Sequence, residues 1–308
     1  MRFSSPPRLL KSQRSSCGKN RLTQISFQVS NRTGIRQISY VTVREAITRY
    51  EPSLHAAGIE SARVDTEWLL VHLLGLSRSE LQLETERILT LSEQEQLQRL
   101  VEQRGQRVPL QHLLGEVDFR GLCLQVDGRA LVPRPETEFL AEVAIGILSK
   151  EVAPRALDVG TGSGCLAISI AVACPCARID ALDISADALV LARKNTVRHQ
   201  VTERILYMEG DGRELLPGGP YHIIISNPPY IPTGDLLGLQ PEVRDHDPRL
   251  ALDGGPDGLE FFRALAVNSA ASLCPGGRLL IEIGDGQAGA VGELFTNCDW
   301  RIELILED

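Results

Sequence analysis

The chain has 308 residues, a length that suits one large or two smaller domains with a sizeable buried core. No apolar run approaches 18 residues, so no membrane-spanning segment is expected. The formal net charge is −8, but residues 1–40 contain eight Lys or Arg and no acid, which leaves 24 bases against 40 acids in the remainder. This acidic remainder argues against tight binding of a nucleic-acid backbone. Seven scattered cysteines with no CxxC pair predict reduced thiols and no metal site.

Residues 1–40 are rich in Ser and Arg and lack hydrophobic periodicity. Their composition is typical of an organellar transit peptide, and it equally fits an over-extended reading frame with translation beginning near Val41. In either case we expect the segment to be disordered and dispensable. The expected location is the cytoplasm, which is bacterial according to the family resemblance described below, or a mitochondrial or plastid matrix if the segment is a transit peptide.

Helix-start signals predict a small all-helical domain over residues 41–115. Capping boxes begin at Thr42 and at Ser92, and Gly75 is a helix stop. On the second helix, Val64, Trp68, Leu69 and residues 71–74 are expected on the apolar side. The predicted helices span 42–57, 61–75 and 92–107. This domain carries no catalytic constellation, so we expect it to bind a partner.

A linker and a stiff loop follow the helical domain. Glu116–Phe119 and Leu122–Val126 predict a hairpin within a linker of residues 116–130. In the next segment, Pro133 and Pro135 stiffen a loop before a helix from Glu136 to Leu148. Its functional interpretation is a lid over the site described below; otherwise it is a well-capped helix start.

From residue 155 strands alternate with helices, which predicts an α/β domain over 131–308 with a parallel sheet covered by helices on both faces. The expected strands are 155–159, 178–183, 204–209, 221–226, 277–283 and 300–306. Helices are expected near 164–173, 186–199, 258–273 and 286–296.

A glycine loop follows the first of these strands and opens a helix. Glycine lets the backbone approach a ligand closely, and the free N–H groups at a helix start face it. The loop consists of Gly160, Thr161, Gly162, Ser163 and Gly164. It suits either a dinucleotide or S-adenosylmethionine, because the G-x-G-x-x-A pattern alone is weak evidence.

Acidic residues at neighbouring strand ends favour S-adenosylmethionine. Asp158 would repel a pyrophosphate but can neutralise the ammonium of a methionine moiety. Asp183 is placed to accept both hydroxyls of a ribose, and Asp211, beside Gly212, can accept from an adenine amino group. We therefore expect this cofactor over a nicotinamide cofactor.

The chemistry is expected at Asn227, Pro228, Pro229 and Tyr230, which follow an Ile-rich strand. Two prolines end the strand and stiffen the loop at its carboxyl end, where ligands of open α/β sheets bind. The Asn227 side-chain oxygen and the Pro228 carbonyl can each accept one N–H of a planar –NH2 group, while Tyr230 stacks on its flat face. A simple strand-ending turn is the alternative interpretation.

With these residues assembled, the chain resembles the HemK-type protein-glutamine methyltransferases that modify peptide-chain release factors. The resemblance covers about residues 42–306. It rests on the glycine loop, on the segments 108–116, 133–138 and 250–259, on Glu242–Arg244 and on Asn227–Ile231. Asn-Pro-Pro-Tyr alone is shared with adenine, cytosine and guanine amino-methyltransferases, so the flanking segments make the match specific.

The resemblance implies a five-helix amino-terminal domain and a seven-stranded, Rossmann-like methyltransferase sheet. By matching position, Asn227 touches both cofactor and substrate, and residues 227–230 hold the glutamine of a Gly-Gly-Gln loop in a class 1 release factor. We expect a monomer that binds neither nucleic acid nor membrane. The chain stops where the family usually adds one more strand, so the final strand pair is expected to be incomplete.

Two other functions stay open at this point. A nucleic-acid amino-methyltransferase would use the same loop on a flipped base, but it predicts a basic groove and a target-reading domain. A non-catalytic helper would keep the fold only to bind a partner, against which the intact glycine loop and Asn-Pro-Pro-Tyr argue.

Overall fold

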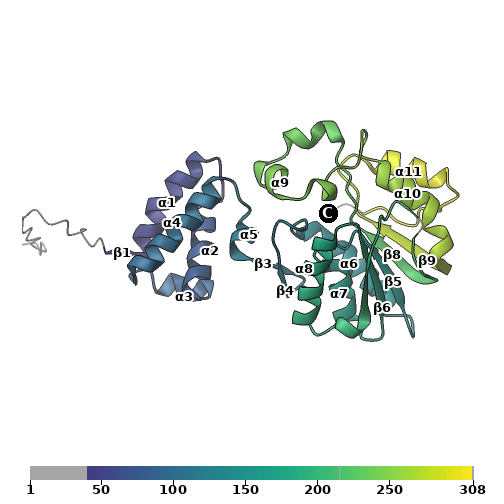
Figure 1. Cartoon of the computed structure of the whole chain (residues 1–308), viewed down its shortest axis with the longest axis horizontal. Helices are drawn as coiled ribbons and strands as arrows, with labels where there is room; N and C mark the ends of the chain where they lie inside the picture. The colour runs from purple at the N-terminus through teal and green to yellow at the C-terminus, as the bar shows by residue number, and fades with distance from the viewer. Residues whose placement is uncertain (1–39, 215, 307–308) are drawn as a thin grey trace, which may run out of the picture. The chain divides into compact units, whose positions relative to one another are not determined.

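The computed structural model describes residues 40–214 and 216–306. The expectations for residues 1–39 therefore lie outside the described residues. Helices and strands follow one another as the sequence predicts for a helical segment and an α/β segment (Figure 1). No helix in the described ranges is long and apolar enough to cross a membrane.

Five helices and a short β-pair form the helical segment, and a cluster of buried leucines and valines holds them together. The capping box at Thr42 and Glu45 is confirmed. The second box is wrong by two residues: the N-cap is Thr90, whose hydroxyl accepts from the backbone N–H of Glu93. The elements are β1 (Val41–Thr42), α1 (Val43–Ala56), α2 (Ala62–Leu74), α3 (Arg78–Leu83), β2 (Ile88–Leu89), α4 (Leu91–Gly105) and α5 (Leu110–Leu114).

The predicted apolar side of α2 is confirmed at Leu69 and wrong at Val64 and Trp68. Val64 and Trp68 are 39% and 37% exposed, whereas Leu69 and Leu70 are fully buried. Arg78 lies over the Trp68 ring at 5.7 Å from its centroid, so a cation–π contact covers part of this ring instead of the core. The helix stop at Gly75 is confirmed by its left-handed backbone.

The expected hairpin is confirmed as β3 (Glu116–Phe119) paired antiparallel with β4 (Leu122–Gln125). Next comes α6 (Pro135–Leu148), with Pro135 in its first turn. The α/β segment then runs through β5 (Arg155–Val159), α7 (Cys165–Ala173), β6 (Arg178–Asp183), α8 (Ala186–Arg198), β7 (Ile205–Glu209), β8 (Tyr221–Ser226), α9 (Pro241–His246), α10 (Glu260–Asn268), β9 (Leu273–Ile281) and α11 (Ala288–Thr296). Short 3₁₀ helices lie at Thr202–Arg204, Thr233–Gly238, Arg249–Ala251 and Ala270–Ser272.

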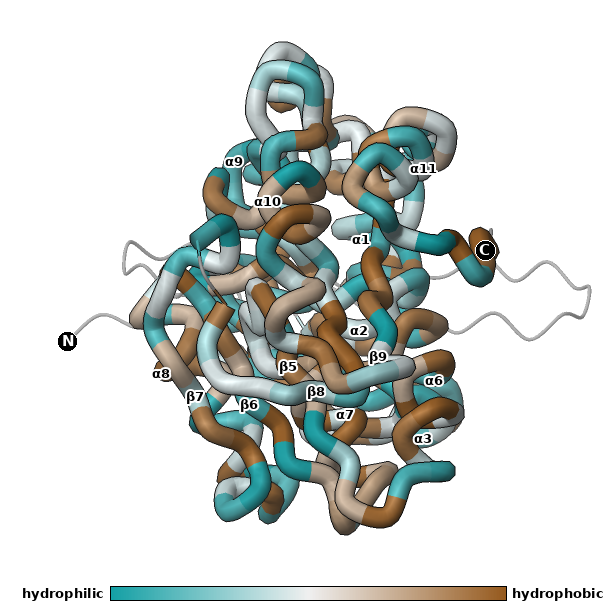
Figure 2. Tube along the Cα trace, turned by 90° about the vertical axis from the view of Figure 1, so that its right-hand side faces the viewer, coloured by the Kyte–Doolittle hydropathy of each residue, from teal (hydrophilic) through white to brown (hydrophobic). Residues whose placement is uncertain are grey.

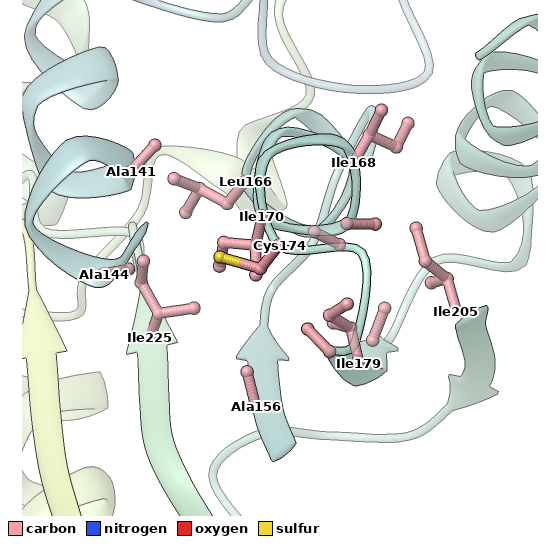
Figure 3. Packing of buried hydrophobic residues seen from close by; sticks show 14 of the residues in the cluster. Ala141, Ala144, Ala156, Leu166, Ile168, Ile170, Cys174, Ile179, Ile205 and Ile225 are labelled. Carbon is pink, nitrogen blue, oxygen red and sulfur yellow. The ribbon is translucent and has the colours of Figure 1, made fainter. Parts of the chain in front are cut away.

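The sheet is parallel, with the strand order β7-β6-β5-β8-β9, and Figure 2 shows these strands side by side. Alternate residues of each strand face opposite layers. Ala156 and Ile225 pack with α6 and α7 on one face (Figure 3). On the other face, Leu157 and Ile224 pack with α10 and α11. The layered α/β architecture is thus confirmed.

The expected strand at 300–306 is wrong: residues 301–306 have no regular secondary structure. The described sheet has five strands, not the six expected from the sequence or the seven implied by the resemblance. Alternating apolar residues form a strand only beside a partner edge and under a covering layer. The side chains of Ile302, Leu304, Ile305 and Leu306 are all exposed, so neither condition holds here.

Candidate active site

A cleft lies at the carboxyl ends of the parallel strands and includes about 990 Å³ of empty space, part of it open solvent. Its walls come from the loops after β5, β6, β7 and β8 and from the segment before α6. Side chains or backbone of Gly160, Asp183, Asp211 and Asn227 lie in these walls. Four positions predicted from their place at or after the carboxyl end of a strand therefore lie together in one cleft, as expected for the ligand site of an open α/β sheet.

The glycine loop is folded against β6 by backbone hydrogen bonds. The N–H groups of Gly160 and Thr161 donate to the Leu182 carbonyl at 2.8 and 3.0 Å. All three glycines have left-handed backbone angles, with φ between 56° and 85°. At Gly164 a Cβ would lie 3.1 Å from Ile168 Cδ1 and 3.2 Å from Ala192 Cβ, so the loop also needs glycine for close packing.

The five loop residues divide into two groups. Gly160, Gly162 and Ser163 line the cleft. Thr161 and Gly164 do not line it; Thr161 is buried, and its hydroxyl donates to Asp158 at 2.6 Å. Thr161 and Gly164 thus stabilise the conformation of the loop without facing the cleft.

Asp158 does not lie in the cleft wall, contrary to the expectation that it meets an ammonium group there. It is completely buried, and its Oδ2 accepts from the Thr161 hydroxyl and from the Ala167 N–H at 3.2 Å. Its Oδ1 has no hydrogen-bond partner among the described residues. Burial raises the pKa of Asp158 to about 7, although the two hydrogen bonds oppose this change. Direct contact with a ligand is excluded in this arrangement.

Asp183, at the end of β6, is hydrogen-bonded to the glycine loop. Its Oδ2 accepts from the Gly162 N–H at 2.8 Å and its Oδ1 accepts from the Ser185 N–H at 2.8 Å. A carboxylate oxygen has two lone pairs, so each oxygen can accept a further hydrogen bond from a ligand. Burial raises the pKa of Asp183, and the two backbone hydrogen bonds oppose that change.

Asp211 and Gly212 line the same cleft after β7. The carboxylate of Asp211 accepts from the Arg213 guanidinium at 2.8 Å, and this hydrogen bond lowers the pKa of Asp211. At Gly212 an added Cβ would lie 2.4 Å from Val159 Cγ1 and 2.9 Å from Phe261 Cζ. The Gly212 backbone and the Phe261 ring therefore pack so closely that a side chain at position 212 has no room.

The Asn-Pro-Pro-Tyr loop is fixed at both ends. Before it, the Ser226 hydroxyl donates to the Val159 carbonyl at 2.7 Å. After it, Ile231 N–H donates to the Leu252 carbonyl at 3.0 Å, and Gln287 Nε2 donates to the Tyr230 carbonyl at 2.9 Å. Together with the two prolines, these bonds give the loop a single shape.

Asn227 has a defined amide orientation. Its Nδ2 donates to Thr137 Oγ1 at 3.1 Å, and the Thr137 hydroxyl donates to Glu282 Oε2 at 2.7 Å. Thr137 is in the first turn of α6, and Glu282 directly follows β9. The Asn227 Oδ1 keeps its lone pairs available for a donor on a ligand.

A second pocket adjoins the cleft. Both hollows are lined by Leu131, Arg134, Asn227 and Ala251, so Asn227 lies at their boundary. Tyr230 and Glu282 line only the second pocket, whereas Pro229 lines only the cleft. Pro228 is buried and lines neither. The predicted loop residues are therefore distributed over two adjoining pockets.

The segment expected as a lid contributes to these walls. Leu131, Pro133 and Arg134 line the cleft. Arg134 NH2 donates to Asp247 Oδ2 at 2.9 Å, which ties the segment to the end of α9. Burial raises the pKa of Asp247 to about 6, while Arg134 opposes the change.

A charged cluster anchors α9 beside the second pocket. Glu242 accepts from Arg104 NH1 at 2.9 Å and from Arg107 Nε at 2.7 Å, and Arg104 Nε donates to Asp65 at 2.6 Å. The next residue, Val243, lines the second pocket. The helical segment thus helps to hold one wall of this pocket.

Known proteins with similar sequences indicate the family of the chain. A family model for the PrmC N-terminal domain matches residues 45–115, and one for the methyltransferase small domain matches residues 137–236. Release factor glutamine methyltransferase from Deinococcus radiodurans is 42% identical over 85% of this chain and 93% of its own length. The enzymes of the same name from Geobacter sulfurreducens and Chlorobaculum tepidum are 41% and 44% identical over 84% and 75% of this chain, and 90% and 81% of their own.

The chain belongs to the release factor glutamine methyltransferase family. Its expected class, a methyltransferase that uses S-adenosylmethionine, is thereby confirmed. A nucleic-acid amino-methyltransferase is not favoured, because these relatives share the name of a protein-modifying enzyme. Among solved structures, a SAM dependent methyltransferase from Agrobacterium tumefaciens matches 59% of this chain and 57% of its own at 16% identity, with a TM-score of 0.43. That likeness is too weak to carry an argument.

Three residues that help to build this methyltransferase site were not predicted from the sequence: Thr137, Phe261 and Glu282. Glu282 follows the carboxyl end of β9, so the same reasoning from strand ends that located Asn227 could have found it. Thr137 is inside the predicted lid, but no pattern shows that its hydroxyl meets Asn227. In the described ranges, no group of three or more His, Cys, Asp or Glu is arranged to hold a metal ion.

Proposed function

We propose that the chain transfers a methyl group from S-adenosylmethionine to the side-chain amide nitrogen of the glutamine in the Gly-Gly-Gln motif of a class 1 peptide-chain release factor. One observation carries this proposal: Asn227 lies at the boundary of two pockets with its Oδ1 available to an N–H donor. A primary amide offers two N–H donors on a planar group, which this arrangement can bind and orient.

The cleft has the properties that S-adenosylmethionine requires. The glycine loop allows close backbone approach, Asp183 keeps acceptor capacity for ribose hydroxyls, and Gly212 leaves a flat surface beside Phe261. The residues proposed to hold the cofactor are Gly160, Thr161, Gly162, Ser163, Gly164, Asp183, Asp211, Gly212 and Asn227. Of these, Thr161 and Gly164 would act by shaping the loop, because they lie outside the cleft wall.

The Asn-Pro-Pro-Tyr residues are proposed to bind and align the glutamine. Asn227 Oδ1 accepts one amide N–H at the boundary of the two pockets, and the Tyr230 ring packs on the amide plane. The Pro228 carbonyl is proposed to accept the second N–H; because Pro228 lines neither pocket in this structure, this contact requires the loop to adjust when the glutamine binds. An amide nitrogen is a weak nucleophile, because its lone pair is delocalised into the carbonyl. Two acceptors on its hydrogens stabilise the positive charge that develops on nitrogen and direct the lone pair toward the cleft.

Alignment is the main catalytic contribution of these residues. When bound, S-adenosylmethionine supplies a methyl carbon on a sulfonium sulfur, which is a good leaving group. Held by the residues of the cleft, it would donate the methyl group to the amide nitrogen and leave as the neutral thioether, and the nitrogen would release one proton to water. Holding the reacting atoms in line can account for about 7–11 kcal/mol of the barrier in favourable cases. Asn227, Pro228 and Tyr230 are therefore the proposed catalytic residues.

The helical segment is proposed as a substrate-binding domain. We assign residues 41–115 to it, 116–130 to the hairpin linker and 131–308 to the methyltransferase domain. The contacts of Arg104 and Arg107 with Glu242 support this role, because they join the helical segment to the wall of the second pocket. We further propose that the chain acts as a monomer and that it works in the bacterial cytoplasm; its bacterial relatives support the second of these proposals.

The test is methylation of purified release factor by the purified chain and S-adenosylmethionine. Peptide mapping by mass spectrometry should locate one added methyl group on the glutamine of the Gly-Gly-Gln motif. A release factor with that glutamine changed to glutamate is the matched control and should stay unmodified. Label on ribosomal RNA or DNA, with the release factor unlabelled, would overturn the proposal in favour of a nucleic-acid amino-methyltransferase.

A further inference from the structure

A hydrogen-bonded chain of three side chains runs behind the Asn227 amide. Thr137 is 2% exposed, and its Oγ1 meets Asn227 Nδ2 at 3.1 Å and Glu282 Oε2 at 2.7 Å. The backbone N–H of Glu282 donates to the Ser226 carbonyl at 3.0 Å, directly beside Asn227. Thr137 belongs to the α6 helix, Asn227 directly follows β8, and Glu282 directly follows β9, the edge strand next to β8 in the described sheet.

The direction of every bond in this chain is determined by chemistry. A carboxylate only accepts, so the Thr137 hydroxyl must donate its single proton to Glu282. The Thr137 oxygen can then only accept from Asn227, which requires the Asn227 –NH2 group on that side. The amide oxygen of Asn227 is therefore the atom left for a ligand. Without Thr137, either end of the amide could face the substrate, and an –NH2 group would oppose the substrate's own N–H donor.

We propose that Thr137 and Glu282 are positioning residues for methyl transfer, which fix the Asn227 amide oxygen toward the acceptor amide and strengthen it as a hydrogen-bond acceptor. Bonds in a connected chain polarise one another, and a carboxylate at the far end increases the effect. Glu282 also lines the second pocket, where its negative charge favours the positive charge that develops on the amide nitrogen. This inference rests on the proposed function.

Three substitutions separate the orienting hydrogen bond of the Thr137 hydroxyl from the effect of the Glu282 charge. Thr137→Val removes the hydroxyl at almost constant volume, Thr137→Ser keeps it, and Glu282→Gln keeps an acceptor oxygen but removes the charge. Under single-turnover conditions with saturating cofactor and release factor, we expect rates about tenfold lower for Thr137→Val and about ten- to a hundredfold lower for Glu282→Gln. Thr137→Ser should restore a rate near that of the wild type.

A matched control distinguishes positioning from stability. Thr196 is also buried, and its hydroxyl meets the Ala192 carbonyl at 2.9 Å within α8 and the Tyr207 hydroxyl, outside both pockets. Thr196→Val should lower the melting temperature about as much as Thr137→Val without the loss in rate. Equal losses in rate for the two variants would overturn the inference.

A double-mutant cycle with Asn227→Ala tests the mechanism itself. Thr137 acts through Asn227, so Thr137→Val should cause no further loss of rate in the Asn227→Ala background. The Asn227 side-chain amide protons, followed by NMR without cofactor or release factor, should exchange slowly in the wild type and rapidly in Thr137→Val.

These outcomes are distinct from failure of the proposed function. If the wild type does not methylate the release factor glutamine, the proposed function itself is wrong. If the wild type methylates it but Thr137→Val costs the same rate with and without Asn227, or leaves the Asn227 amide protons equally protected, the positioning role is wrong.

Discussion

The buried carboxyl of Asp158 makes the stability of the fold depend on pH in a defined direction. Its folded-state pKa is about 7, against an ordinary value of 3.8, because burial penalises the charged form. The folded chain therefore binds a proton that the unfolded chain has already released between these two pH values. The free energy of unfolding must decrease as pH rises from about 4 through 7.

The magnitude follows from the difference in pKa. A difference of about 3 pKa units corresponds to about 4 kcal/mol in total, as an upper estimate. Between about pH 5.5 and 8.5 the decrease amounts to about 2 kcal/mol, because the folded carboxyl has released nearly all of its proton soon above pH 7. In Asp158→Asn this contribution disappears, so the difference between wild type and variant isolates it from all other titrating groups.

Urea unfolding at a series of pH values measures this difference. In Asp158→Asn the new amide oxygen can still accept from Thr161 and Ala167, but the –NH2 group would replace the unpartnered Oδ1 and cost about 1–3 kcal/mol at every pH. The test is therefore the slope and not the absolute stability. Curves of unfolding free energy that run parallel for wild type and Asp158→Asn would refute this description of the buried carboxyl.

Two further predictions concern the cofactor cleft. Asp183→Ala should weaken cofactor affinity by about 1.5–3 kcal/mol in calorimetric titration, while the single-turnover rate at saturating cofactor stays close to wild type; unchanged affinity would remove Asp183 from the site. Gly212→Ala should destabilise the fold by about 1–3 kcal/mol in urea unfolding and weaken cofactor binding at least tenfold, because its Cβ would displace the Phe261 ring. Gly234→Ala, where an added Cβ meets nothing within 4 Å, is the control and should change neither.

Local rules predicted the parts of the fold that local chemistry determines. The capping box at Thr42 and the hairpin around Arg120 and Gly121 follow from side-chain and turn preferences of adjacent residues. At the second box, Ser92 and Thr90 both offer a hydroxyl, and only the register of α4 decides between them. The strand predicted at 300–306 failed because an exposed segment without a partner edge has no ladder to join.

The site residues that follow the carboxyl ends of parallel strands could be predicted from the sequence. Asp183, Asp211 and Asn227 follow strand ends, so topology alone brings them to one cleft. The burial of Asp158 was not predictable, because it depends on how the glycine loop covers the end of β5. The contact between Thr137 and Glu282 joins residues that are 145 positions apart, and no local pattern encodes it.

The proposed mechanism depends most directly on Asn227, and the single-turnover rate of Asn227→Ala measures the role of this residue. Labelled S-adenosylmethionine and release factor are both saturating, so that binding defects do not limit the rate. We expect methyl transfer by Asn227→Ala to be about a hundred- to a thousandfold slower than by the wild type, by analogy with the loss of one oxyanion-hole donor. Asn297→Ala, at the exposed end of α11, is the control and should react like wild type. A rate for Asn227→Ala close to that of the wild type would contradict the proposed mechanism.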